Sequence, residues 1–170
     1  MKAVTPTKTN AARLLDSFGI VYELRAYEVD PDDLTAISVA RKIGLPAEQV
    51  FKTLLSHTND GQYLFAVIPG DSELDLKKLA QAAGSKKAEL ASLKEVEPLT
   101  GYIRGGVTVM GSRKPFPAFA DETIELFDVI SVSAGVRGVQ VILSPADYLR
   151  ASAAKLADLT KAIAPAGDAR

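Results

Sequence analysis

The 170-residue sequence contains no cysteine and no tryptophan, and its single histidine is His57. Without cysteine the chain has no disulfide and no thiolate metal site, and one histidine is too few for a histidine-based metal cluster. No apolar run approaches the roughly 20 residues that a membrane-spanning helix needs. No apolar stretch followed by a small-residue cleavage site marks a signal peptide, so we expect a cytoplasmic protein with no membrane partner.

The familiar motifs of catalysis are missing as well. The sequence has no GxGxxG, no GxxxxGK[ST], no HExxH and no GxSxG elbow. The formal net charge is −1 at pH 7, so any binding of nucleic acid depends on a local basic patch and not on overall charge. These absences argue against the common nucleotide-binding, zinc-hydrolase and cysteine-nucleophile classes.

Helical and strand patterns alternate along the chain, whose length and 47% hydrophobic content suit one domain over residues 1–170. The dipeptide Asp60-Gly61 predicts a hairpin turn between two apolar runs. We therefore expect an α+β fold, a single compact domain with a mixed, mostly antiparallel sheet flanked by helices. The periodicity predicts helices over 7–18, 35–43, 74–83, 91–96 and 145–164, and strands over 20–27, 50–58, 62–69, 118–120, 129–133 and 139–144.

Lys52 lies in the strand-like run VFKTLL, with Val50 and Leu54 on the same strand face. A lysine between apolar neighbours is costly to bury. One interpretation is an edge-strand lysine that reaches solvent and prevents aggregation. The other is a cation that faces a pocket and holds a carbonyl or phosphate oxygen. The pattern by itself favours the first.

Three further features allow a structural or a functional interpretation. The glycine-rich run TGYIRGGVTVMG is typical of turns or bulges, or of a place where a ligand approaches the backbone. The segment Ser131–Gly138 suits a hairpin connection or an anion-binding nest. Tyr27, at the end of a predicted strand, suits a half-buried core position or the rim of a pocket.

Four segments, VFKTLL, LDLKKLAQAAGSKKAEL, TGYIRGGVTVMG and ISVSAGVRG, occur in the order found in the YbaK/EbsC family. The chain resembles this family from about Pro6 to Ile163. The resemblance implies a compact domain with a pocket beside its sheet, similar to the editing domain of some bacterial prolyl-tRNA synthetases. It also implies trans-editing deacylation of mischarged tRNA, notably Cys-tRNA(Pro), by an enzyme of lyase or hydrolase type.

In the chemistry that the resemblance implies, the thiol of the substrate attacks the ester carbonyl and leaves as a cyclic thiolactone. The enzyme then needs no nucleophile, cofactor or metal. The implied partners are the aminoacyl-tRNA 3′ end and, as a second candidate, prolyl-tRNA synthetase. By resemblance Lys52 is the catalytic lysine, which orients the tRNA 3′ end and stabilises negative charge. The substrate-binding positions are Tyr27, Thr53, Gly105, Gly106, Ser133 and Arg137.

Two positions depart from the cysteine-specific pattern, Thr35 where an aromatic residue is common and Gln140 where an aspartate occurs. Both belong to the expected pocket wall, so they leave open an Ala-tRNA(Pro)-type editing hydrolase. They also leave open a non-catalytic module that binds tRNA or a synthetase. Four basic residues near the expected pocket are predicted to contact tRNA phosphates: Arg104, Arg113, Lys114 and Arg137.

Overall fold

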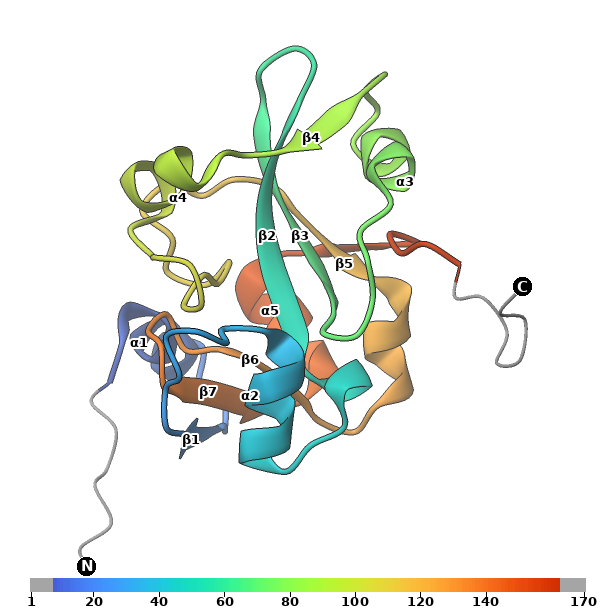
Figure 1. The fold of residues 1–170 in the computed structure, drawn as a ribbon. Helices are drawn as coiled ribbons and strands as arrows, with labels where there is room; N and C mark the ends of the chain where they lie inside the picture. The colour runs from blue at the N-terminus through green and yellow to red at the C-terminus, as the bar shows by residue number, and fades with distance from the viewer. Residues whose placement is uncertain (1–7, 163–170) are drawn as a thin grey trace, which may run out of the picture.

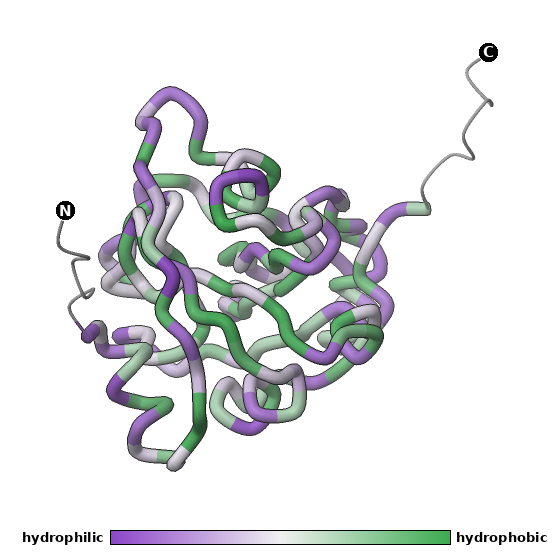
Figure 2. Tube along the Cα trace, turned by 90° about the horizontal axis from the view of Figure 1, so that it is seen from below, coloured by the Kyte–Doolittle hydropathy of each residue, from purple (hydrophilic) through white to green (hydrophobic). Residues whose placement is uncertain are grey.

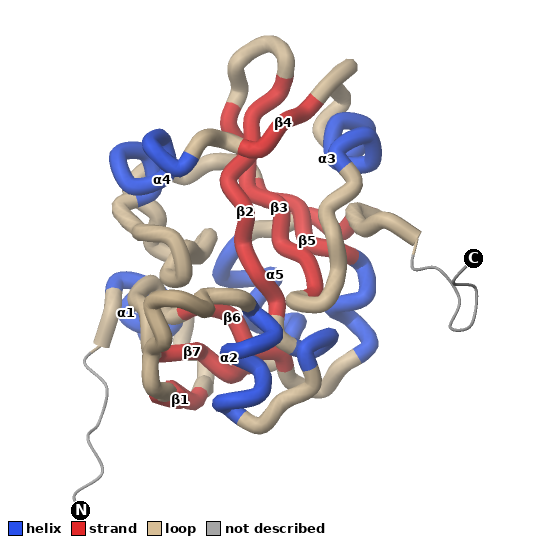
Figure 3. The backbone as a smooth tube through the Cα atoms, viewed as in Figure 1, coloured by secondary structure: helices blue, strands red, loops and turns tan. Residues whose placement is uncertain are grey.

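Two β-sheets form the framework of residues 8–162, the part of the chain that the computed structural model describes. The three-stranded sheet has the order β1 (Glu23–Ala26), β7 (Val139–Leu143), β6 (Ile130–Ser133). The five-stranded sheet has the order β4 (Ala88–Leu90), β2 (Phe51–Thr58), β3 (Tyr63–Pro69), β5 (Ala118–Asp121), β8 (Lys155–Ala157). In Figures 1 and 3 the smaller sheet lies below the larger one, next to the lower end of β2.

The helices begin and end at residues that satisfy their terminal backbone groups. The Thr9 and Thr35 hydroxyls accept hydrogen bonds from the first turns of α1 and α2. Gly44 ends α2 in the left-handed conformation with φ of 78°. The helical elements are α1 (Asn10–Ser17), α2 (Ala36–Ile43), η1 (Ala47–Gln49), α3 (Leu76–Ala82), α4 (Leu93–Thr100), η2 (Glu122–Leu126) and α5 (Pro145–Ser152), with η1 and η2 being 3-10 helices.

Pairing within the sheets is mixed. The pairs β1–β7, β6–β7, β2–β3 and β2–β4 are antiparallel, whereas β5 runs parallel to both β3 and β8. The predicted α+β class with mostly antiparallel pairing is confirmed. The single expected sheet is in fact two, joined at an isolated bridge between Val50 and Ser131.

The hairpin β2–β3 forms the centre of the molecule. Asn59 to Gly61 make its turn, and Gly61 has φ of 82°. Side chains of β2 alternate between two cores: Phe51 and Leu55 belong to one, and Leu54 packs against the other. Figure 2 shows hydrophobic stretches mainly along inner segments of the chain and hydrophilic residues at several outer turns.

The predicted helix over 145–164 is wrong beyond Ser152. The chain leaves α5 at Ala153, whose φ of 56° is left-handed, and then forms β8. β8 pairs in parallel with β5, from Phe119↔Lys155 to Asp121↔Ala157. A long-range strand pair has therefore replaced the helix that this alanine-rich sequence favours locally. Residues 163–164 of that prediction, and residue 7 of the first predicted helix, lie outside the described residues.

No helix within residues 8–162 is both long enough and apolar enough to cross a membrane.

Candidate functional site

A cavity of about 450 Å³ opens where the two sheets meet. Its walls are the start of α2, the first half of β2, the segment before α4, the glycine-rich loop and the polar ends of β6 and β7. A cavity of this volume suits a small-molecule group. Its polar and charged lining includes Thr35, Lys52, Thr53, Arg104, Ser133 and Gln140, and no aspartate or glutamate is among the described residues that line it.

Lys52 lies half-buried on β2, and its Nζ donates a hydrogen bond of 3.3 Å to the carbonyl of Gly70. Burial lowers the pKa of Lys52, while the carboxylates of Asp71 and Glu73 act in the opposite direction. The observed position is neither that of a free surface lysine nor that of a buried ion pair. Lys52 is a partly desolvated cation at the cavity, tied to the main chain at the end of β3.

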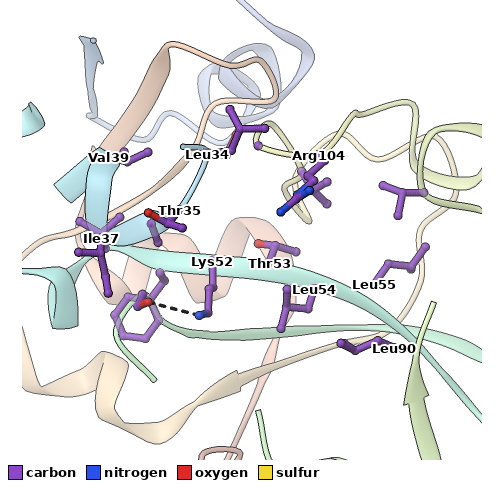
Figure 4. Close-up of a pocket in the computed structure, with 18 of the residues that line it drawn as sticks. Leu34, Thr35, Ile37, Val39, Lys52, Thr53, Leu54, Leu55, Leu90 and Arg104 are labelled. Atoms are coloured by element: carbon purple, nitrogen blue, oxygen red, sulfur yellow. Dashed lines mark hydrogen bonds between the residues drawn. The ribbon is translucent and has the colours of Figure 1, made fainter. Parts of the chain in front are cut away.

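Thr53 and Lys52 extend to opposite sides of β2, and Arg104 faces the Thr53 side from the loop across the cavity (Figure 4). Behind Thr53 lies Tyr148 of α5, which is fully buried and whose hydroxyl has no hydrogen-bond partner among the described residues. Burial raises the pKa of Tyr148, so this phenol stays protonated. Of these residues Lys52, Thr53 and Arg104 line the cavity, whereas the Tyr148 phenol lies buried outside the lining.

The glycine-rich loop and the turn after β6 pack directly against each other. The Arg137 Nε donates a 2.8 Å hydrogen bond to the carbonyl of Arg104. A Cβ on Gly105 would lie 3.3 Å from Arg137, and a Cβ on Gly106 would lie 3.1 Å from the backbone of Val136. Gly105 also has φ of 88°, which favours glycine. At this position the glycines permit close packing of two loops, the arrangement that holds Arg104 over the cavity.

The structure brings together only part of the predicted substrate-binding set. Thr53, Gly105 and Ser133 line the cavity together with the predicted catalytic residue Lys52, whereas Tyr27, Gly106 and Arg137 do not. Tyr27 is partly buried against the core beneath α2, and its backbone N–H donates to the carbonyl of Gly138. The functional roles of all seven residues remain predictions.

Both positions that depart from the cysteine-specific pattern line the cavity. The Thr35 hydroxyl accepts a hydrogen bond from Ser38 N and donates one of 2.7 Å to Asp33. Gln140 is 5% exposed, and its Oε1 accepts a 2.8 Å hydrogen bond from the hydroxyl of Ser131. The wall at these positions is neutral, without an aromatic ring or a carboxylate.

The apolar part of the cavity could not be predicted from the sequence. Leu34 and Ile37 come from the start of α2, and Leu90, Leu93 and Val96 come from the segment that enters α4. Ile37, Leu90 and Leu93 are exposed at 48%, 51% and 66%. Their contribution depends on where β4 and α4 pack, for which the sequence offers no local signal. Within the described residues, no three histidine, cysteine or acidic side chains are arranged to hold a metal ion.

A family model and the sequences of known proteins both relate this chain to proteins that edit aminoacyl-tRNA. Residues 30–151 match the aminoacyl-tRNA editing domain family. The "Putative Cys-tRNA(Pro)/Cys-tRNA(Cys) deacylase EbsC" of Enterococcus faecalis is 42% identical over 159 residues, which cover 94% of this chain and 97% of that protein. The multifunctional Ser/Thr-tRNA deacylase ProXp-y of Escherichia coli K12 is 35% identical over 101 residues, 59% of this chain and 60% of that protein.

The fold has solved counterparts as well. A crystal structure described as "a putative trans-editing enzyme for prolyl tRNA synthetase" superimposes with a TM-score of 0.77 at 25% identity. The match covers 94% of this chain and all of the other. The likeness therefore extends over nearly the whole fold.

Proposed function

We infer that this chain, which belongs to the aminoacyl-tRNA editing domain family, is an aminoacyl-tRNA deacylase that acts in trans on mischarged tRNA. We propose Cys-tRNA(Pro) as its substrate, since the name of the E. faecalis relative includes this activity. In this proposal the binding partner is the tRNA 3′ end, and prolyl-tRNA synthetase is a second candidate partner. Residues 1–170 are proposed to form one editing domain. The observation that carries the proposal is Lys52, a half-buried cation in a cavity without a lining carboxylate.

The proposed reaction uses the nucleophile of the substrate. The cysteine sulfur attacks its own ester carbonyl, so a C–S bond forms while the C–O bond to the terminal ribose breaks. The thiol proton ends on the departing ribose oxygen, and the amino acid leaves as a cyclic thiolactone. The protein has to position the ester and stabilise the oxyanion that forms at the carbonyl.

Lys52 suits this task because it is positioned before the substrate arrives. Its hydrogen bond to the Gly70 carbonyl fixes the Nζ, and partial burial strengthens its attraction for a developing oxyanion or a phosphate. We assign Lys52 to holding the tRNA 3′ end and stabilising negative charge, and not to proton abstraction. In this proposal the backbone at Gly105 and the Ser133 hydroxyl border the terminal adenosine or the ester.

The neutral wall at Thr35 and Gln140 favours a second candidate, a deacylase for tRNA charged with another small amino acid. The E. coli relative is named for serine and threonine, and alanine is smaller than either. Water would then have to act as the nucleophile, because these side chains carry no thiol. Saturable binding of tRNA without turnover would favour a non-catalytic module.

A deacylation panel tests the proposal. The purified protein is incubated with Cys-tRNA(Pro), Ala-tRNA(Pro) and Ser-tRNA, and release of the amino acid is followed over several turnovers. We expect Cys-tRNA(Pro) to be the best substrate and Lys52→Ala to reduce its kcat/KM by about 100-fold, as for loss of an oxyanion donor. The matched control is Lys155→Ala, on the exposed edge strand β8, which we expect to leave the rate unchanged. Equal background rates for wild type and Lys52→Ala on all three substrates would refute the enzyme assignment.

A further inference from the structure

The cavity runs along one edge of β2. Six consecutive residues from Val50 to Leu55 line it. Because side chains alternate across a strand, a cavity on one face would touch only every second residue. Contact with all six therefore means that the cavity borders the edge of the strand, where main-chain groups point.

This edge is paired at both ends of the cavity, and no ladder covers the middle. At one end Val50 makes an isolated bridge with Ser131 of β6. At the other, the Ala91 N–H donates a 2.9 Å hydrogen bond to the carbonyl of Leu55, and β4 pairs only with residues 56–58. Pairing with β3 occupies the opposite edge along the whole of this stretch. Thr53 lies halfway between the two paired ends.

The direction of the Thr53 main chain follows from its neighbours. The Leu55 carbonyl faces the open edge, because it bonds Ala91. The Val50 carbonyl and the Thr58 N–H face the opposite edge, because they bond Gly70 and Gln62 of the β3 side. In an antiparallel strand, each residue presents its N–H and its C=O to the same edge, and alternate residues share that edge. The N–H and C=O of Thr53 therefore point into the cavity.

An aminoacyl ester carries the complementary pair of groups. Its α-ammonium is a hydrogen-bond donor and its ester carbonyl is an acceptor, and both belong to the same amino acid. They correspond to the N–H and the C=O with which one residue pairs with another across two antiparallel strands. The α-ammonium needs an acceptor, and no described carboxylate lines the cavity, where Lys52 and Arg104 are cations. A main-chain carbonyl supplies this acceptor without a charged group.

We propose that the main chain of Thr53 binds the aminoacyl group as a one-residue strand pair, its C=O accepting from the α-ammonium and its N–H donating to the ester carbonyl. This proposal rests on the proposed function and adds to it a contact that is independent of the amino-acid side chain. It also places a donor on the carbonyl under attack, separate from Lys52 on the other strand face.

Binding of stable analogues tests the contact without turnover. We use 3′-cysteinylamino-3′-deoxyadenosine, whose amide carbonyl replaces the ester, and the same compound without its α-amino group. Titration of the wild-type protein should show about 10-fold or more weaker binding of the deamino compound, the effect of a hydrogen bond to a charged group. Equal affinity for the two compounds, or no binding of the first, would overturn the proposal.

A backbone change tests the second half of the pair. Thr53 is replaced by its α-hydroxy acid, which retains the side chain and removes the N–H, while the Lys52 carbonyl, which faces β3, becomes a weaker ester acceptor. We expect about 5-fold weaker binding of the cysteinyl analogue with only a small fall in Tm from the weakened β3 contact, because the Thr53 N–H itself has no ladder partner. A lower Tm with unchanged affinity would assign the N–H a structural role and contradict us. Thr53→Pro compared with Thr53→Val repeats the test by ordinary mutagenesis, since proline is tolerated at strand edges. The deacylation panel reports separately on the proposed function.

Discussion

Tyr102, a buried residue of the glycine-rich run, packs against the glycines on either side of it in space. Tyr102 is 7% exposed, and its hydroxyl donates a 2.7 Å hydrogen bond to the carbonyl of Met110. A Cβ on Gly135 would lie 2.8 Å from its ring, and a Cβ on Gly111 would lie 2.9 Å from its hydroxyl. Tyr102 therefore supports the two segments that close one side of the cavity.

We predict that Tyr102→Phe lowers the free energy of unfolding near neutral pH by about 1 kcal/mol, the usual value of one lost hydrogen bond. Burial raises the pKa of Tyr102 to about 12 from its ordinary value of 10. Between these two values the unfolded chain releases this proton and the folded chain retains it, so wild type loses stability as pH rises. The difference between wild type and the variant should therefore shrink above pH 10. Urea unfolding at several pH values measures it, and a difference that stays constant to pH 12 would contradict the predicted linkage.

At the scale of elements, the end of α5 is the least expected feature of the chain. Ala153 is exposed and has a left-handed φ of 56°, a conformation that is unfavourable for residues with a Cβ. The chain turns there because Lys155–Ala157 must reach β5. Asp121, 1% exposed, supports this connection by accepting a 2.9 Å hydrogen bond from Leu159 N.

Ala153→Gly should therefore stabilise the protein by about 0.5–1 kcal/mol, because glycine adopts this conformation without a steric penalty but loses more entropy on folding. Ala153→Val is the matched opposite and should destabilise, since a β-branched residue tolerates positive φ poorly. Thermal unfolding of the three proteins should give the order Gly, Ala, Val from most to least stable. If Gly is less stable than Ala, the left-handed turn is not a significant source of strain.

At the scale of the whole molecule, a chain of net charge −1 has to attract tRNA through local positive charge. Arg104 lines the cavity, Arg137 bonds its carbonyl, and the Arg113 side chain donates to the Pro98 carbonyl. Two of the four predicted basic residues, Arg113 and Arg137, thus donate to main-chain carbonyls, and Lys114 is exposed beside Arg113.

Replacing Arg113 and Lys114 together by glutamine should weaken tRNA binding and lower the slope of log K against log salt by roughly 1.5, about 0.7–0.9 for each lost phosphate contact. The control with the same charge change is Lys155→Gln with Lys161→Gln at the opposite edge of the five-stranded sheet, where we expect the slope to stay the same. Binding is measured from 50 to 200 mM salt, a range over which phosphate contacts have a strong effect. Equal slopes for the two double variants would mean that Arg113 and Lys114 are ordinary solvated surface.

Local sequence determined the helix ends and turns that depend on the type of one or two residues. Thr35 and Gly44 bound α2 because capping and left-handed φ depend on residue type, and Asp60-Gly61 turns the central hairpin for the same reason. The alternation in VFKTLL assigned Lys52 and Thr53 to opposite faces of β2, as observed. The ordered segments also indicated the family and hence the expected chemistry.

Only the tertiary structure decided how these elements meet. β8 replaces predicted helix because its partner β5 lies more than 30 residues away, beyond the reach of local propensity. Gly106 packs against Val136, and Tyr27 lies against α2 away from the cavity lining, since both positions depend on loop packing. The open edge at Thr53 exists because β4 and β6 pair with β2 only at either end. Residue types determine which groups a strand carries, but neighbouring strands determine which of its main-chain groups stay free for a ligand.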